Sequence, residues 1–437
     1  MIAPLLLLAL AAVQQVEGPV PNPSKEVARL LKQLDANAAA DREAAEKQLL
    51  AMGPTILPLL PNAANVTAEV KIRLSRIRNQ LEKLGAEGAT KGTRVTLQGK
   101  SLKFKDALAA FTKQTGNKFL DLRDNMGQEV TNPEVDLDLK DLSFWEGLDK
   151  LLDEAEMTTY GFGTGGDEKE PDNKIGLMNR PEGELPRAGR ASYSGPFRVA
   201  ATRVDAVRDL NRKEGGVLRL GLHIAWEPRL RPIVIDLPGN ELKITDDFLG
   251  EIAPANPEAE MSSEVQADVN GVEFDLPLQL PARNAQKLAT VQGKLIALVP
   301  GRVENFEFAL PKLDPKKKVE LPMEKRSGGV TVQIFDWSKN VETYQVEVRV
   351  KFDEGGEAFA SHRNWILNNE AYLVDPKGER IGFGSYETTV QNNENEVGVS
   401  YKFPLEGVPE GYKFVYRTPA AIVKLPVPFT LKDLPLP

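Results

Sequence analysis

The sequence contains no cysteine among its 437 residues. Disulfide bonds, thiol nucleophiles and cysteine-ligated metal sites are therefore excluded. Histidine is almost as scarce, since only His223 and His362 occur, and this nearly excludes most transition-metal sites and Ser-His-Asp triads. No apolar run reaches the roughly 18 residues that a membrane-spanning helix needs. We therefore expect no membrane span, no metal and no cofactor.

Neither sign of charge is in large excess. The chain has 55 Lys and Arg residues against 63 Asp and Glu residues, which gives a net charge of −8. This balance disfavours a non-specific nucleic-acid binder, because such proteins bind phosphates through Lys and Arg. Hydrophobic residues make up 41% and charged residues 27%, a composition that excludes a fully disordered chain. A chain of this length is expected to form about two to four domains.

The N-terminus has the pattern of a secretory signal peptide. The residues from Leu5 to Val13 form an unbroken apolar run that is too short to span a bilayer, and Ala9-Leu10-Ala11 supplies a small-x-small cleavage pattern. We predict a signal peptide over residues 1–13, with cleavage between Ala11 and Gln15. A buried first helix is the alternative. The mature protein is accordingly expected to be periplasmic or secreted.

Residues 22–86 have the spacing of short antiparallel helices. One apolar stripe runs through Val27, Leu30, Leu31 and Leu34, and a later one through Val70, Leu74, Ile77, Leu81 and Leu84. Gly53 and Pro54 are the expected stop pair between helices. Helices this short must pack on each other to be stable. The stretch from Asp41 to Leu60 resembles a HEAT-like helical repeat pair.

An internal repeat lies in the next segment. Residues 95–108 (VTLQGKSLKFKDAL) recur 40 positions later as residues 135–148 (VDLDLKDLSFWEGL), with six of fourteen positions identical. Each copy begins with the alternation of a strand and continues with helical spacing. In the second copy, Ser143 and Glu146 form a capping box. We therefore predict a split βαβ sandwich over residues 92–180, with one sheet covered by two helices.

The first copy also carries a family pattern. It matches "L-x-F-x-D-A-L…T-G" at Leu102, Phe104, Asp106, Ala107, Leu108, Thr115 and Gly116. In these residues the segment resembles the short N-terminal domain shared by secretins and TonB-dependent receptors. The resemblance implies a non-enzymatic docking or ring-packing module. Only this interaction role carries over, because the pore and receptor parts of those families do not follow here.

Two features of this segment suggest ligand chemistry. The glycines from Gly161 to Gly166 are reminiscent of a phosphate-binding loop, but a polar stretch follows instead of a helix, which favours a simple hairpin loop. Asp136 and Asp138 lie on one strand face and form a conceivable calcium ledge. Because calcium takes six to eight oxygens from a curved loop, a solvated strand face is the better interpretation.

The remaining chain has the pattern of antiparallel strands. Residues 181–194 are rich in Pro, Gly and Arg and are predicted to form a linker. From residue 195 onward, apolar and polar residues alternate, with His223 on the polar side of one strand. The apolar positions of that strand are Leu218, Leu220, Leu222, Ile224 and Trp226. Strands without intervening long helices favour antiparallel β-sandwiches.

A loose repeat indicates two such sandwiches. The stretch from Gly293 to Leu310 resembles the stretch from Gly411 to Leu431, with a "Phe-x-Leu" ending in both. One immunoglobulin-sized sandwich of about 100 residues would be too small for this region. We expect two tandem antiparallel β-sandwiches, over residues 195–316 and 322–437.

Aromatic residues and one histidine are the remaining candidates in this region. Trp226 and Trp365 fit strand patterns and are expected in the core. Trp337 follows Asp336 near a turn and is the better candidate for surface contacts such as sugar stacking. His362 lies beside Ser361 and Arg363, but the sequence offers no partner set for a triad.

Trp145 is the second candidate interaction residue. It lies about 100° from Phe144 around the helix, at the edge of the apolar stripe. It is expected either to complete the core of its own domain or to anchor a neighbouring part, the helical repeat or the first sandwich.

The sequence thus predicts a multidomain α+β protein with a short helical repeat, a split βαβ sandwich and two tandem antiparallel β-sandwiches. This order resembles secreted proteins of planctomycete-type bacteria. We expect a non-enzymatic structural or interaction protein of the bacterial envelope whose partners are proteins, not nucleic acid. The alternative is a carbohydrate-binding or hydrolase activity in the β-sandwich half, for which a deep cleft with converging acids would be required.

Overall fold

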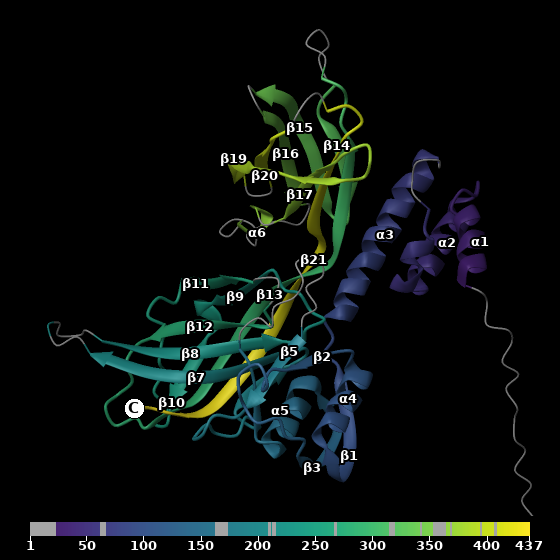
Figure 1. Ribbon diagram of the computed structural model, residues 1–437. Helices are drawn as coiled ribbons and strands as arrows, with labels where there is room; N and C mark the ends of the chain where they lie inside the picture. Colours follow the sequence, from purple (N-terminus) through teal and green to yellow (C-terminus); the bar gives the residue numbers. More distant parts are fainter. Residues whose placement is uncertain are drawn as a thin grey trace, which may run out of the picture. The chain divides into compact units, whose positions relative to one another are not determined.

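The computed structural model divides the chain into two compact units, residues 1–84 and 85–437 (Figure 1). About 22% of the chain is helix and about 50% is strand, mostly in antiparallel sheets, which makes it an α+β, mainly sandwich-like protein. None of the described helices is both long and apolar enough to span a membrane. The described residues are 23–61, 67–161, 174–208, 211, 216–265, 269–313, 320–340, 343–352, 364–367, 369–393, 396–405 and 409–437.

Three calls from the sequence fall outside these residues: the signal peptide, the glycines from Gly163 to Gly166, and His362. The first unit is helical. It contains α1 (Pro23–Gln33), α2 (Ala39–Ala51), a 3-10 helix η1 (Pro54–Leu59) and α3 (Ala68–Ala89). Gly53 lies between α2 and η1 with a φ of 76°, a conformation that glycine adopts without strain. The predicted stripes form the core, except that Leu84 is exposed.

The second unit begins with an α/β domain that contains both predicted strand–helix pairs. Its elements are β1 (Arg94–Lys103), α4 (Phe104–Thr115), β2 (Lys118–Asp121), β3 (Glu134–Ser143), α5 (Phe144–Glu154), β4 (Met157–Thr159) and β5 (Lys174–Asn179). The prediction of one sheet is wrong: β1 pairs with β3, whereas β2, β5 and β4 form a separate sheet. Helix α5 buries residues around most of its circumference, so it can be covered on two sides.

The internal repeat is visible in the backbone of this domain. Ser101 and Asp141, 40 residues apart, both have a left-handed φ, of 50° and 51°. Each of their N–H groups donates to a side chain of the opposite strand: Ser101 to Asp136 Oδ1 at 2.8 Å and Asp141 to Thr96 Oγ1 at 3.0 Å. The same offset relates the bonds at the two helix starts and the left-handed residues at their ends: Phe104–Pro133 with Phe144–Thr93, and Gly116 with Glu156.

The first β domain packs two sheets against each other. One sheet contains β12 (Gly271–Leu278), β8 (Gly216–Trp226), β7 (Phe197–Arg208) and β6 (Ala191–Ser194). The facing sheet contains β9 (Val234–Pro238), β10 (Lys243–Asp246), β11 (Glu260–Glu264) and one end each of β13 (Lys287–Ala309) and β21 (Lys413–Pro435); η3 (Gly239–Glu241) follows β9. Because β6 pairs with β7, the last four residues of the predicted linker belong to the sheet.

A long antiparallel ribbon joins the two β domains (Figure 1). Strands β13 and β21 have 23 residues each and pair from Lys287–Pro435 to Ala309–Lys413. One end of the ribbon contributes to the core of the first β domain and the other end to that of the second. The structure therefore differs from the predicted boundaries at residues 316 and 322, because the C-terminal strand returns to the first β domain.

The ribbon also explains the loose repeat in the sequence. Gly293 lies opposite Phe429, and Phe308 lies opposite Phe414, so the similar stretches are the two strands of one pair. An antiparallel pair is related by a local twofold axis, which gives both strands the same pattern. A Cβ atom on Gly293 would lie 2.6 Å from the Phe429 ring, so the ring covers the glycine.

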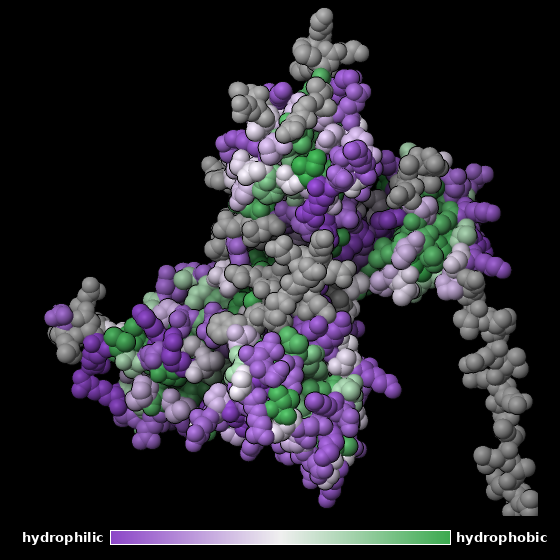
Figure 2. Space-filling model, viewed as in Figure 1, coloured by the Kyte–Doolittle hydropathy of each residue, from purple (hydrophilic) through white to green (hydrophobic). Residues whose placement is uncertain are grey.

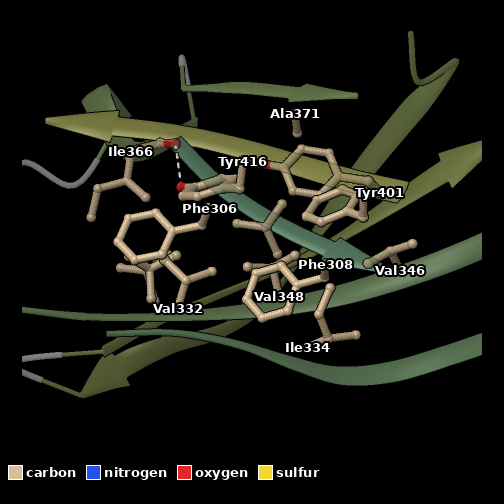
Figure 3. Close-up of a cluster of buried hydrophobic side chains, with 14 of the residues drawn as sticks. Phe306, Phe308, Val332, Ile334, Val346, Val348, Ile366, Ala371, Tyr401 and Tyr416 are labelled. Carbon is tan, nitrogen blue, oxygen red and sulfur yellow. Dashed lines mark hydrogen bonds between the residues drawn. The ribbon is translucent and has the colours of Figure 1, made fainter. Parts of the chain in front are cut away.

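The second β domain has the same layered build. Its outer sheet contains β14 (Met323–Ser327), β15 (Val330–Asn340), β16 (Thr343–Phe352), β20 (Glu396–Phe403) and β19 (Ser385–Asn393). The ribbon continues opposite it with β17 (Glu370–Val374) and β18 (Arg380–Gly382), and α6 (Asn364–Leu367) lies nearby. Figure 3 shows the buried side chains between the layers, where Tyr416 donates to the carbonyl oxygen of Ile366 at 3.5 Å.

Candidate functional site

A buried polar cluster on α5 holds the α/β domain on the first β domain. Its centre is Asp149, whose side chain is fully buried. Asp149 Oδ1 accepts from Arg187 Nε at 2.8 Å, and Oδ2 accepts from Arg198 Nε and from the Tyr193 hydroxyl, both at 2.7 Å. Arg198 belongs to β7 and Tyr193 to β6, whereas Arg187 precedes β6. One carboxylate therefore links three parts of the chain.

The charges of this cluster are balanced internally. Burial alone would raise the pKa of Asp149, but the positive charges of Arg198 and Arg187 outweigh it and hold this pKa below its usual value. Burial, together with the charge of Asp149, raises the pKa of Tyr193 far above its usual value, so its hydroxyl remains a donor. Burial lowers the pKa of Arg187, yet an arginine remains protonated at neutral pH.

Asp153 extends the contact by one helical turn. Its carboxylate accepts the backbone N–H of Arg187 at 2.8 and 3.0 Å and that of Ala188 at 2.8 Å, and it also binds Arg180. Because residues four apart lie on one helix face, Asp149 and Asp153 share a face of α5. The segment before β6 is therefore tied to this helix along its length.

Trp145 is the third member of this α5 face. Its side chain is 3% exposed, packs edge-on against Phe144 at a ring distance of 5.3 Å, and donates through Nε1 to the carbonyl oxygen of Pro196 at 3.0 Å. It thus lies in the core of its own domain and also contacts the first β domain. Since it is buried, it offers no surface to an additional partner in this conformation.

His223 of β8 lies beside the same cluster. Burial is the main cause that lowers its pKa to about 4, and the charges of Arg198 and Arg187 act in the same direction. The imidazole is therefore neutral at pH 7. A hollow of about 30 Å³ adjoins it, lined among others by Trp145 and Asn270, which is room for about one water molecule.

A second buried carboxylate fixes the other end of β8. Glu227 accepts from the backbone N–H and the hydroxyl of Thr93, both at 2.7 Å, from Asn117 Nδ2 at 3.0 Å and from Arg229 Nε at 2.9 Å. Thr93 precedes β1 and Asn117 follows α4. The α/β domain is therefore bonded to the first β domain at both ends of their contact.

These carboxylates are engaged in holding structure together. Both oxygens of Asp149 and of Glu227 accept hydrogen bonds from groups that remain protonated at neutral pH. The calcium ledge is engaged as well, since Asp136 accepts from Ser101, and Asp138 from Gln98 and Lys140. Within the described ranges, no group of three or more His, Asp or Glu side chains is arranged to bind a metal.

The expectation that Trp337 is a surface residue is wrong. Its side chain is 2% exposed, and Nε1 donates to the carbonyl oxygen of Pro311 at 2.9 Å. A β-bulge between Ile334 and Asp336 shifts the register of β15. The bulge reverses the inward and outward alternation, so the tryptophan points into the core. Trp226 is fully buried as expected, and nothing is described for the side chain of Trp365.

Sequence reasoning missed Asp149, Asp153 and Glu227. The available signal was weak: two acids four residues apart flank an apolar helix face, and arginines are frequent in the segment from 180 to 198. The ion-pair partners of Asp149 are 38 and 49 residues away in the sequence. No local spacing could have paired them.

Comparison with known proteins adds no relative. No family model, no curated protein and no solved structure matches the chain. The functional assignment therefore depends on the contacts, burial and charges of the residues themselves.

Proposed function

We propose that the protein is a non-enzymatic interaction scaffold of the bacterial envelope, exported by its N-terminal segment to the periplasm or beyond. The main support is the use of the buried carboxylates. Asp149, Asp153 and Glu227 accept hydrogen bonds that hold two domains together, whereas a catalytic acid or base must be able to exchange a proton with a substrate.

The internal repeat suggests where a partner would bind. The α5 face formed by Trp145, Asp149 and Asp153 is occupied by the first β domain. The positions 40 residues earlier are Lys105, Ala109 and Lys113 of α4, and all three are exposed. Figure 2 shows a mainly hydrophilic surface on this part of the α/β domain. The exposed α4 face is the counterpart of a face already used for docking, and its two lysines suit an acidic partner protein.

The resemblance to the short N-terminal domain of secretins and TonB-dependent receptors agrees with this role. In this proposal, residues 92–180 dock a partner, and the sandwich-like β domains serve as a rigid mount. The HEAT-like character of the helical unit belongs to the same proposal. Helical repeats of this kind present extended surfaces to other proteins.

The hydrolase alternative receives no support from the two larger hollows. Both lie on the first β domain, with volumes of about 330 and 310 Å³. Their linings include one acidic side chain between them, Asp433, and this residue is paired with Lys287. Glycoside hydrolysis requires two carboxyl groups that flank the scissile bond.

Site-specific photo-crosslinking tests the proposed partner site. A photoreactive amino acid replaces Ala109 in the full-length protein in its host cells, and Glu182, which is exposed elsewhere, provides the matched control position. We expect one discrete adduct from position 109, weakened by Lys105→Glu and Lys113→Glu, that is recovered again when the identified partner is tagged. Identical adducts from both positions, or none from position 109, would contradict the proposal.

Export is tested separately by N-terminal sequencing of the protein from envelope and medium fractions. Cleavage between Ala11 and Gln15 is the expected result. A mature chain that retains Met1 would contradict the proposed export signal.

A further inference from the structure

A turn at one end of the first β domain exposes two large apolar side chains. The turn follows β10, and it presents Phe248 and Leu249, which are 61% and 86% exposed. These are the two most exposed large hydrophobic side chains among the described residues. Leu249 also has a φ of 63°, a left-handed conformation that is unfavourable for leucine. Exposed apolar groups on an unfavourable backbone indicate a functional constraint.

The turn is held rigidly. The buried Asp246 accepts through Oδ1 the N–H groups of Phe248 at 2.9 Å and Gly250 at 2.7 Å. Its own N–H donates to the Gly250 carbonyl oxygen at 2.9 Å. A Cβ atom on Gly250 would lie 2.7 Å from the Asp246 carboxylate, so this closed turn requires a glycine. A fixed backbone lowers the entropy lost when the two side chains bind.

An open hollow of about 330 Å³ lies next to this turn. Its lining includes the apolar side chains of Leu218, Leu280 and Leu436, and two arginines, Arg208 and Arg283. Both arginines are exposed. The hollow is therefore apolar at its base and positively charged at its edge.

The turn and the hollow belong to the same end of the domain. The backbone N–H of Gln286 donates to both carboxylate oxygens of Asp247 in the turn, at 3.2 and 3.3 Å. The carbonyl oxygen of Gln286 accepts from the N–H of Leu436, which lines the hollow, at 2.8 Å. Figure 1 shows β10 and the C-terminus close together at this end.

We infer that the hollow of a second copy of this chain receives Phe248 and Leu249. The two surfaces are complementary: the apolar pair is flanked by Asp247 and Glu251, whereas the apolar hollow is edged by arginines. Because turn and hollow are adjacent, a twofold axis between two copies brings each turn to the other copy's hollow. The result is a closed dimer with two identical contacts.

The size of the contact sets the expected affinity. The exposed parts of the two side chains amount to roughly 250 Å², since a large apolar side chain buries about 150–250 Å². Two contacts, each with a similar area from the hollow, bury about 1,000 Å², the lower limit for a specific interface. We therefore expect a reversible dimer with a dissociation constant in the micromolar range.

Analytical ultracentrifugation of the mature full-length chain over a hundredfold concentration range tests this inference. The wild type is expected to dimerise, and the double variant Phe248→Ser, Leu249→Ser to dissociate at least tenfold more readily. Leu185→Ser, at another apolar residue that is 59% exposed, is the matched control and should behave like the wild type. Unchanged melting temperatures show that the variants fold.

A charge exchange provides the second arm. Glu251→Arg and Arg283→Glu should each weaken self-association, and an equimolar mixture of the two should recover a heterodimer in which one of the two contacts regains opposite charges. A monomeric wild type, or a dimer insensitive to all these variants, overturns the inference. If the monomer instead floats with phosphatidylcholine vesicles through Phe248 and Leu249, the turn binds lipid. Either result leaves the crosslinking test of the α4 face unaffected.

Discussion

Replacement of Asp149 by asparagine is the sharpest perturbation of the domain contact. The substitution keeps the size of the side chain but removes its charge. Asp149 has no exposed side-chain area, and the side chains of Arg187 and Arg198 are 11% and 6% exposed. After the change, two guanidinium groups face each other in a buried site without a counter-charge.

The expected loss is large. Removing one partner of a buried ion pair costs about 3–5 kcal/mol, because the remaining charge stays buried and unpaired. The pKa of Asp149 is lower in the folded than in the unfolded protein, so the carboxylate stabilises the fold above its unfolded pKa of about 4. This contribution is lost as the pH falls through the folded pKa. The difference between wild type and Asp149→Asn should therefore shrink below about pH 4.

Urea unfolding of the full-length protein at pH 7, followed by tryptophan fluorescence, measures this loss. Glu146→Gln is the matched control on the same helix, since Glu146 and Lys150 form a partly exposed ion pair at 3.5 Å. The control should lose less than about 0.5 kcal/mol. A loss for Asp149→Asn as small as that of the control would refute the reasoning.

Three further predictions concern the same framework. His223→Gln should flatten the decline in stability between about pH 6.5 and pH 4, because the neutral imidazole is favoured by folding and its pKa is about 4 in the folded chain; an unchanged pH profile in thermal melts would contradict this. Trp145→Ala should cost about 3–5 kcal/mol and Trp145→Phe less, since phenylalanine retains most of the packing; equal losses in denaturant melts would argue against the hydrogen-bonded geometry. Gly293→Ala should destabilise by about 1–3 kcal/mol, because its new methyl group would meet the Phe429 ring. Gly382→Ala, which meets no atom within 4 Å, is its control in the same thermal melts.

Local patterns predicted the elements better than their arrangement. Six identities between two stretches 40 residues apart located both strand–helix pairs of the α/β domain, and the structure confirms them. The division into two sheets could not be predicted, because it depends on which strands pair. Likewise, two similar stretches indicated tandem repeats, whereas they form one antiparallel ribbon from Lys287 to Ala309 and Lys413 to Pro435.

The candidate interaction residues show the same limit. Trp145 was located correctly at the edge of a helix stripe, and both alternatives considered for it hold in part, since it is buried and also bonds to Pro196. Trp337 was misplaced because one bulge at residue 335 reverses the alternation of its strand. Asp149 was overlooked because its partners are close only in the folded chain.

Native-state hydrogen exchange tests most directly whether the buried carboxylates unite the α/β domain and the first β domain. If they do, the slowest amides of α5 and of β7 and β8 should exchange with the same opening free energy. Asp149→Asn should lower the value for α5 and for these strands together. Exchange of α5 at a distinctly lower free energy than β7 and β8 in the wild type, unchanged by Asp149→Asn, would contradict the account.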